Sequence, residues 1–202
     1  MKTIAWNVDT QYDFMSPVGK LYIKGAEELE PTLERLTKYF RRHGTTIVNT
    51  ADYHTRISEE LSDKPDFVNT FPEHCIMGSE GVEFIPEVRP NKPYVVDWIG
   101  RVLDLERLAD SKEIVIYKDK FDVFKGNLDT DKVLGALAPE RVIVYGVATD
   151  YCVDYAVTGL LDRGLEVYVV EDAIKEIASK EPVLEKWKAR GAKLIMAADL
   201  YK

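Results

Sequence analysis

The fold of this chain is indicated most clearly by residues 142–154, which read VIVYGVATDYCVD. An apolar run, a Gly-Val-Ala turn and a more polar continuation predict a buried strand, a tight turn and a helix. Cys152 lies in the first turn of that helix, where free N–H groups and a partial positive charge favour a thiolate over a thiol. It is therefore a candidate nucleophile. The alternative interpretation is a small buried side chain, because free cysteines are among the most buried residues.

Strands and helices alternate on both sides of this segment. Strands are predicted over residues 4–9, 45–52, 114–118, 141–148, 165–171 and 192–197, and helices over residues 26–43, 128–138, 149–163 and 181–190. Apolar strands separated by helices indicate an α/β fold, a doubly wound parallel sheet with helices on both faces. Residues 53–101 are less regular, and we expect part of a functional site there. Because no internal repeat or linker interrupts the pattern, residues 1–202 are expected to form a single domain.

The composition narrows the classes of function. The 202 residues carry a net charge of -8, which argues against a nucleic-acid partner. No apolar run reaches the length of a membrane span and the N-terminus does not resemble a signal peptide, so no membrane partner is expected. Two cysteines, Cys75 and Cys152, are too few and too far apart for a disulfide framework, which indicates a reducing cytoplasm. Cys75 is interpreted as a small buried side chain.

Four residues with useful chemistry lie at the ends of predicted strands. Asp9, Asp52 and Lys118 each close a strand, and Cys152 follows a fourth one. Ligands bind at the carboxyl ends of the strands in open parallel sheets, so these side chains are expected to surround one crevice. A lysine beside the thiol would lower the pKa of the thiol. Taken singly, Asp9 is also explained as a turn cap and Lys118 as a solvated charge.

The three histidines have different surroundings. His43 follows two arginines at the end of a predicted helix, where a cation stabilises the helix C-terminus. The segment Asp52-Tyr53-His54 and the later His74 together supply three ligands suited to a divalent metal, although both histidines are also explained as loop packing. If they bind a metal, no histidine is left to act as a base for the thiol. Asp9 is then the candidate base.

These residues resemble the isochorismatase-like cysteine hydrolases, most closely the nicotinamidase and pyrazinamidase branch. The resemblance covers nearly the whole chain, and its motifs occur in the order typical of the family. They are residues 9–14 (DTQYDF), 52–54 (DYH), 71–75 (FPEHC), Gly78 with Gly81, 118–124 (KDKFDVF) and 146–153 (GVATDYCV). The resemblance implies a three-layer, Rossmann-like domain with a six-stranded parallel sheet.

The resemblance also implies roles for particular residues. It implies a catalytic triad of Asp9, Lys118 and Cys152. It implies a cis peptide bond between Val147 and Ala148, which would direct the backbone N–H groups of Ala148 and Cys152 into an oxyanion hole. Nucleophilic attack would pass through a Cys152 thioester.

A metal and a substrate pocket follow from the same resemblance. The metal would be zinc, with iron or manganese as alternatives, and in nicotinamidases it binds the nitrogen of the pyridine ring. Its protein ligands would be Asp52, His54 and His74. The residues expected to contact the substrate are Phe14, Phe71 and Val147.

The sequence departs from the branch near the pocket. Many nicotinamidases have a further histidine or carboxylate shortly after the Asp-x-His segment, and here Glu59, Glu60 or Asp63 are the candidates for that position. Phe71 occupies a position at which tryptophan is frequent. Both departures concern the pocket, so they leave the identity of the amide open.

The function implied is the hydrolysis of nicotinamide to nicotinate and ammonia, a step of NAD salvage. A first alternative is a related amidase acting on another small amide, such as a carbamoyl or ureido compound. Such relatives usually lack the metal-binding set. A second alternative is a non-catalytic small-molecule-binding protein, which would have lost the triad. Because the family forms dimers and larger assemblies, a homo-oligomer is expected.

Overall fold

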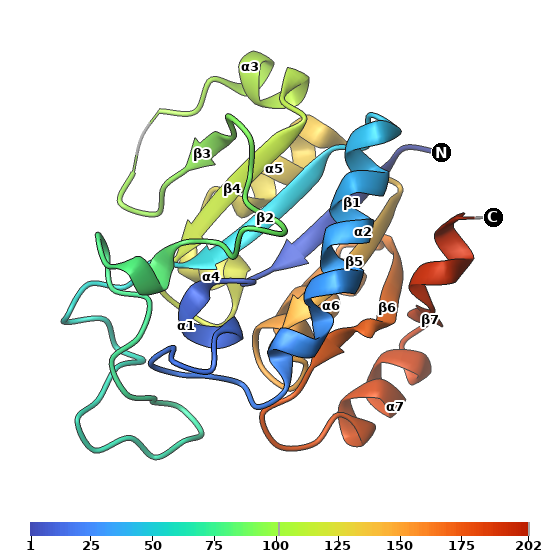
Figure 1. The fold of residues 1–202 in the computed structure, drawn as a ribbon. Helices are drawn as coiled ribbons and strands as arrows, with labels where there is room; N and C mark the ends of the chain where they lie inside the picture. Colours follow the sequence, from blue (N-terminus) through green and yellow to red (C-terminus); the bar gives the residue numbers. More distant parts are fainter. Residues whose placement is uncertain (101, 202) are drawn as a thin grey trace.

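A parallel β-sheet runs through the centre of the protein, here a computed structural model describing residues 1–100 and 102–201 (Figure 1). Within these residues the sheet has seven strands in the order β3-β4-β2-β1-β5-β6-β7, and every pairing is parallel. The strands are β1 (Thr3–Val8), β2 (Ile47–Asp52), β3 (Tyr94–Val96), β4 (Glu113–Lys118), β5 (Arg141–Val147), β6 (Glu166–Lys175) and β7 (Lys193–Ile195). The α/β class and the parallel sheet are thus confirmed.

The sheet has seven strands where six were expected. The additional strand is β3, which pairs with β4 at the edge of the sheet. It lies in the irregular region and is only three residues long, directly after Pro93. Such a short run cannot display the period of two by which a strand is recognised in a sequence.

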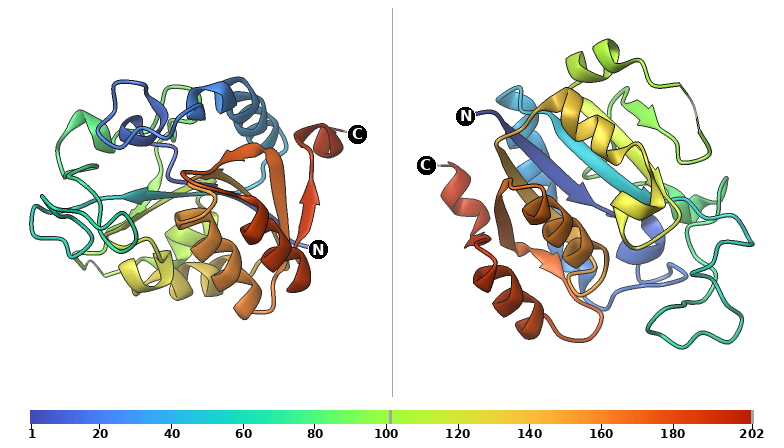
Figure 2. Two further views of the ribbon diagram at one scale, coloured as in Figure 1. Left: turned by 90° about the horizontal axis from the view of Figure 1, so that it is seen from below. Right: turned by 180° about the vertical axis from the view of Figure 1, so that it is seen from behind.

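Helices cover both faces of the sheet (Figure 2). One face carries α1 (Tyr12–Met15), η1 (Ala26–Leu29), α2 (Glu30–Arg42) and η3 (Ala197–Tyr201). The other carries α3 (Leu105–Asp110), α4 (Val123–Gly126), α5 (Thr130–Leu137), α6 (Cys152–Asp162) and α7 (Glu181–Ala189). Alternate residues of a strand face opposite sides, so Ile4 and Trp6 pack in one core and Ala5 in the other. None of the described helices is long and apolar enough to cross a membrane.

Two predicted helices differ in their start points. The helix expected from residue 26 begins with the 3-10 segment η1, and α2 follows with Pro31 in its first turn. Proline lacks an N–H and is tolerated there, where that group would have no helical partner. The helix expected from residue 149 begins at Cys152, because Ala148 to Tyr151 form a turn instead. The thiol therefore belongs to the first residue of α6.

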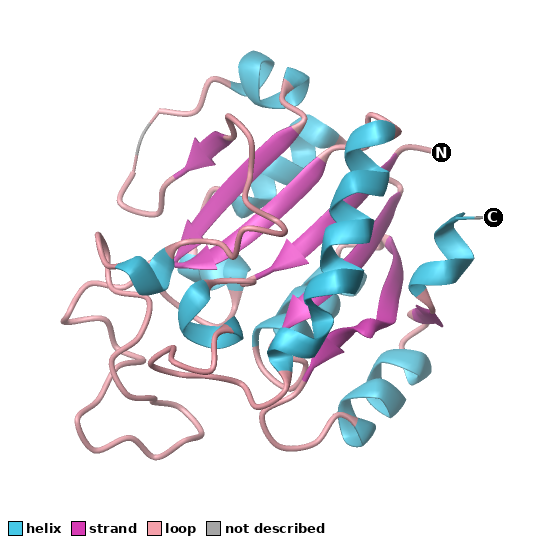
Figure 3. Ribbon diagram, in the orientation of Figure 1, coloured by secondary structure: helices cyan, strands magenta, loops and turns pink. Residues whose placement is uncertain are grey.

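The topology decides where side chains from distant segments meet. The order of the strands reverses between β1 and β5, which is where open α/β sheets bind their ligands. Most of the chain between β2 and β3 is loop, apart from the short helix η2 (Glu80–Val82), and it lies at the carboxyl ends of the strands (Figure 3). The pairing of β2 with β4 sets Asp52 directly beside Lys118.

Candidate active site

Of the four side chains expected at the strand ends, those of Asp9, Asp52 and Cys152 surround the ammonium group of the fourth, Lys118. Its Nζ lies 2.9 Å from Asp9 Oδ2 and 3.5 Å from Cys152 Sγ. It also forms an ion pair with Asp52 Oδ1. All four residues are buried. The structure therefore brings together a carboxylate, an ammonium group and a thiol from three separate segments, beside a second carboxylate.

Asp9 is held in one orientation. It follows β1 with a φ of 47°, in the left-handed region that aspartate tolerates better than most residues. The hydroxyl group of Thr50 donates a hydrogen bond of 2.6 Å to Asp9 Oδ1, which leaves Oδ2 facing Lys118. Burial raises the pKa of Asp9 above its ordinary value of 3.8, Lys118 lowers it, and the nearby Asp52 raises it further. Asp9 therefore binds a proton more readily than an exposed aspartate.

Lys118 carries a charge that its neighbours require. Burial by itself would lower its pKa, but the carboxylates of Asp52 and Asp9 outweigh burial and raise that pKa well above 10.5. Burial likewise opposes the charge of Asp52, yet Lys118, His54 and His74 hold the pKa of Asp52 well below 3.8. Buried charges are tolerated when they are paired and hydrogen-bonded in this way.

The thiol of Cys152 differs from the expectation in its protonation state. Burial raises the pKa of Cys152 well above its ordinary value, Lys118 opposes that effect, and Asp9 and Asp52 add to it. The position at the start of α6 and the lysine neighbour were expected to favour a thiolate. Desolvation and two nearby carboxylates outweigh them, so the resting group is a thiol. A base is needed to remove its proton during a reaction.

The turn between β5 and α6 borders the thiol. The peptide bond between Val147 and Ala148 is cis, as the resemblance implies. The carbonyl oxygen of Ala148 accepts hydrogen bonds from the N–H groups of Tyr151 (3.1 Å) and Val153 (3.0 Å). Within the described residues, the N–H groups of Ala148 and Cys152 do not donate any of the turn and loop hydrogen bonds. Both are therefore available to an oxygen atom of a ligand.

Gly146 allows this turn to approach β1. Its φ is 118°, and a Cβ atom built on it would lie 2.1 Å from the carbonyl oxygen of Val8. Any side chain would separate the ends of β1 and β5. The glycine thus permits the short distance between Asp9 and Cys152.

A second group of buried donors adjoins the first. Asp52, His54 and His74 offer ligand atoms that lie within 4.8 Å of one another, and Nε2 of each histidine is 3.7 Å from Asp52 Oδ2. His74 Nδ1 lies 2.7 Å from the carbonyl oxygen of Pro72, which directs Nε2 toward Asp52. Both ring nitrogens of His54 lack a hydrogen-bond partner among the described residues. Buried imidazole nitrogens without partners fit a metal site, so these residues suit a divalent metal.

The other grouping of carboxylates and thiol does not suit a cation. Asp9, Asp52 and Cys152 also lie within 4.8 Å of one another, but Lys118 contacts all three. A metal ion there would face the ammonium charge.

None of the three additional carboxylates belongs to the Asp52, His54 and His74 group in the described structure. Glu59 is exposed and pairs with Lys120 at 3.1 Å, and Asp63 is exposed as well. The carboxylate of Glu60 instead accepts hydrogen bonds from the N–H group of Phe121.

Gln11 is a site residue that the sequence analysis did not identify. Its side chain is buried and accepts a hydrogen bond of 2.7 Å from the N–H group of Asp52. It donates to the carbonyl oxygens of Asp52 (2.8 Å) and Val82 (2.9 Å). The side-chain amide of Gln11 thus fixes the backbone of Asp52, whose carboxylate is shared by the two groups of side chains. The available signal was a polar residue closely following a buried strand, in the first motif of the chain.

Replacing Gln11 with leucine is expected to weaken the binding of a divalent metal by about 10- to 100-fold, because supporting hydrogen bonds orient metal ligands. Zinc affinity would be measured by chelator competition. Leu33→Ala in α2 is the control, since it destabilises the core without removing a hydrogen bond to Asp52. Equal zinc affinity in Gln11→Leu and the wild-type protein would contradict the positioning role.

A narrow hollow opens beside Cys152. It is lined by Phe14, Leu21, Ile23, Asp52, Phe71, His74, Phe121, Ala148, Tyr151, Cys152 and Ile177. The rings of Phe71, Phe121 and Tyr151 meet edge to face, with centroids 5.2 to 5.7 Å apart. None of these lining residues is a lysine or an arginine.

The hollow agrees in part with the expected pocket. Phe14 and Phe71 line it as expected. Val147 does not, since it is the last residue of β5 and packs in the core beneath, while Ala148 lines the hollow. Phe121 and Tyr151 were not predicted to line the hollow. Each lies in a segment that was considered for a nearby reactive residue, Lys118 in one case and Cys152 in the other.

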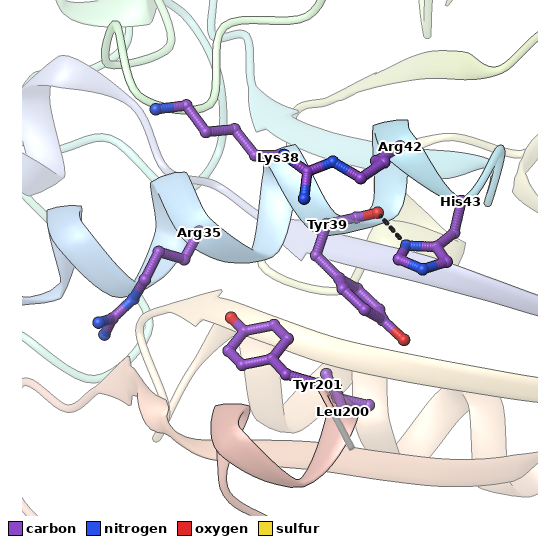
Figure 4. A pocket seen from close by; sticks show the side chains of 7 residues that line it. All are labelled: Arg35, Lys38, Tyr39, Arg42, His43, Leu200 and Tyr201. Carbon is purple, nitrogen blue, oxygen red and sulfur yellow. Dashed lines mark hydrogen bonds between the residues drawn. The ribbon is translucent and has the colours of Figure 1, made fainter.

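Another hollow lies between α2 and η3 and shares no lining residue with the first (Figure 4). Its lining residues are Arg35, Lys38, Tyr39, Arg42, His43, Leu200 and Tyr201. His43 is the C-cap of α2, the helix end at which it was expected, and its Nδ1 lies 2.8 Å from the carbonyl oxygen of Tyr39. Lys38 pairs with Glu34 at 2.6 Å. This hollow contains neither a thiol nor a carboxylate among its lining residues.

Known proteins match both the sequence and this structure. An isochorismatase domain model matches residues 100–199. The nicotinamidase of Saccharomyces cerevisiae is 25% identical over 209 residues, covering 93% of this chain and 94% of that protein. The crystal structure of the Pyrococcus horikoshii pyrazinamidase in complex with zinc superposes with a TM-score of 0.74 at 27% identity, covering 97% of this chain and 99% of that one. The N-carbamoylsarcosine amidase of Thermoplasma acidophilum shares the fold, with a TM-score of 0.76, 23% identity and coverages of 98% and 97%.

Proposed function

This chain belongs to the isochorismatase-like hydrolases, and we propose that it converts nicotinamide and water to nicotinate and ammonia. The family match and the nicotinamidase relatives indicate a hydrolase of amide carbon–nitrogen bonds. The observation that carries the finer proposal is the contact of Lys118 with both Asp9 and Cys152, next to an aromatic hollow and a set of metal-binding side chains.

In the proposed mechanism, Asp9 is the base and Cys152 the nucleophile. The pKa of Cys152 is raised, so Asp9 accepts the thiol proton as sulfur bonds to the amide carbon. Lys118 keeps Asp9 ionised before that transfer. The protonated Asp9 then gives its proton to the departing nitrogen, which leaves as ammonia when the carbon–nitrogen bond breaks. A water molecule next transfers a proton to Asp9 and adds to the thioester, and the Cys152 sulfur, released as nicotinate forms, takes that proton back from Asp9.

The backbone supports the charge that develops on the carbonyl oxygen. The N–H groups of Ala148 and Cys152 flank the turn before α6 and are the proposed donors. A single donor of this kind contributes about 2.7–4 kcal/mol to transition-state stabilisation.

Asp52, His54 and His74 would hold a divalent metal, proposed to be zinc, which when bound supplies a Lewis acid able to accept the lone pair of a ring nitrogen. Phe14 lies against His74, with ring centroids 5.3 Å apart, and offers an apolar wall for the same ring. The ring would thereby be oriented with its amide group toward the thiol.

The lining of the hollow favours nicotinamide over a carbamoyl amino acid. A carbamoyl amino acid carries a carboxylate, and burying that charge requires a paired cation. Apart from Asp52, His74 and Cys152, the residues that line the hollow are aromatic and aliphatic, without lysine or arginine, and the proposed metal is assigned to the ring nitrogen. Lys118 is already engaged by two carboxylates of the protein. A flat, uncharged aromatic amide therefore fits this hollow better.

The proposal is tested by measuring ammonia release from nicotinamide with purified protein, before metal removal, after removal, and after zinc is restored. We expect release that depends on the metal. Release from an N-carbamoyl amino acid but none from nicotinamide would favour the alternative amidase. An ammonia-producing ureido compound without a carboxylate is a useful third substrate, because it separates charge from shape.

The activity is expected to decrease as the pH is lowered below neutrality. A base must be ionised to act, and burial raises the pKa of Asp9 above 3.8, so protonation begins at a higher pH than for an exposed aspartate. The ratio kcat/KM should decrease as the pH falls through that raised pKa. It would be measured from about pH 3 to about pH 8, with circular dichroism at each pH to verify folding. An acid limb centred at or below 3.8 would contradict this assignment.

A further inference from the structure

Glu60 connects the two loops that carry the aromatic walls of the hollow. Its two carboxylate oxygens accept hydrogen bonds of 3.0 and 2.8 Å from the N–H group of Phe121. Its own carbonyl oxygen accepts the N–H group of Phe71 at 2.8 Å. The two phenylalanine rings line the hollow and meet edge to face, with centroids 5.7 Å apart. Glu60 is therefore hydrogen-bonded to the backbone of both phenylalanines.

The two connections are not equivalent. Phe71 is held on both sides of its backbone, since its carbonyl oxygen also accepts the N–H group of Ser62 at 2.9 Å. The N–H group of Phe121 donates only to Glu60 among the described residues. Losing the carboxylate should therefore release Phe121 and leave Phe71 in place.

The surroundings of the Glu60 carboxylate do not resemble those of a surface charge. No lysine or arginine of the described chain forms an ion pair with it, whereas the adjacent Glu59 pairs with Lys120. Burial raises the pKa of Glu60 to about 8, against the opposing effect of the Phe121 N–H group. A carboxyl group half-removed from water without a cation is costly unless it makes a specific contact. The contact here is the N–H group of Phe121.

We propose that Glu60 is a positioning residue for the substrate ring, which holds Phe121 against Phe71 and so maintains a slot for a flat aromatic amide. This inference rests on the proposed function. It gives Glu60 a role other than that of a metal ligand, for which its place in the loop after His54 made it a candidate.

The test compares Glu60→Ala with Glu60→Gln, because glutamine keeps an oxygen that accepts the Phe121 N–H group. For nicotinamide, we expect Glu60→Ala to raise KM about tenfold with a change in kcat below about threefold, and Glu60→Gln to restore most of the loss. Glu59→Ala is the matched control, since it removes the neighbouring carboxylate from the surface. Zinc content should be equal in all three variants and in the wild-type protein.

Hydrogen exchange supplies a readout that is independent of the substrate. The Phe121 amide should exchange faster in Glu60→Ala than in the wild-type protein, and Glu60→Gln should retain most of the protection. Unchanged exchange of that amide, or an unchanged KM in Glu60→Ala, would overturn the proposal. Loss of zinc in both Glu60 variants would overturn it in favour of metal ligation. If the wild-type protein does not release ammonia from nicotinamide, the proposed function fails, and the exchange rates still decide whether Glu60 holds Phe121.

Discussion

Replacing Cys152 with alanine is expected to lower kcat by more than about 10⁴-fold, because the sulfur is the atom proposed to bond to the amide carbon. The remaining groups can still bind the amide and polarise its carbonyl, but they do not provide a route through a thioester. Ammonia release at saturating nicotinamide is the measurement. A mass shift corresponding to the trapped acyl group should be detectable in the wild-type protein and absent from the variant.

Cys75→Ala is the matched control for this substitution. Cys75 is a buried thiol that donates a weak hydrogen bond to the carbonyl oxygen of Gly81 at 3.6 Å, and it has no place in the proposed mechanism. Its replacement should leave the trapped acyl group detectable on the protein. Substantial turnover by Cys152→Ala would exclude the thioester mechanism. Binding of nicotinamide without any turnover by the wild-type protein would instead favour non-catalytic ligand binding.

Replacing Lys118 with methionine should have the largest effect on stability. The substitution leaves Asp9 and Asp52 buried without their shared cation, which typically costs about 3–5 kcal/mol in unfolding free energy. Without Lys118 the pKa of each carboxylate rises, so both become easier to protonate. The deficit relative to the wild-type protein should therefore be smaller at acid pH and grow as the pH rises and the two carboxylates ionise. Denaturant unfolding at several pH values measures it.

The same substitution should lower kcat by about 10²- to 10⁴-fold at neutral pH, since a protonated Asp9 cannot accept the thiol proton. The acid limb of kcat/KM should move to higher pH as well. Lys188→Met is the control, because Lys188 forms an exposed pair with Glu185 on α7, and such pairs contribute about 0–1 kcal/mol. A Lys118→Met protein as stable as this control would show that the two carboxylates do not depend on the ammonium group.

Much of the fold could be predicted because its pattern is local. Strands buried on both faces need runs of mainly apolar or β-branched residues, and such runs mark β1, β4, β5 and the first half of β2 in the sequence. Residues at the ends of such strands are therefore known to share one edge of the sheet before any distance is known. That is why Asp9, Asp52 and Lys118 could be grouped in advance.

The parts that escaped prediction depend on contacts between distant segments. The strand β3 is too short to show a period and exists because β4 offers an edge. The hydrogen bonds between Gln11 and Asp52 and between Glu60 and Phe121 join segments about 40 to 60 residues apart, and the sequence around Gln11 or Glu60 does not indicate which backbone group its side chain will contact. The lining of the hollow likewise combines six separate segments.

The sequence by itself determined the α/β order of elements, the reactive residues at the ends of the strands, and the presence of a thiol at the start of a helix. Only the tertiary structure decided how those residues interact. It surrounded Cys152 with two carboxylates and removed it from water, so that its pKa is raised where the helix start and a lysine had indicated the opposite. The physical reason is that a buried charge is governed by desolvation and by its nearest charges in space, and both are set by how the chain packs.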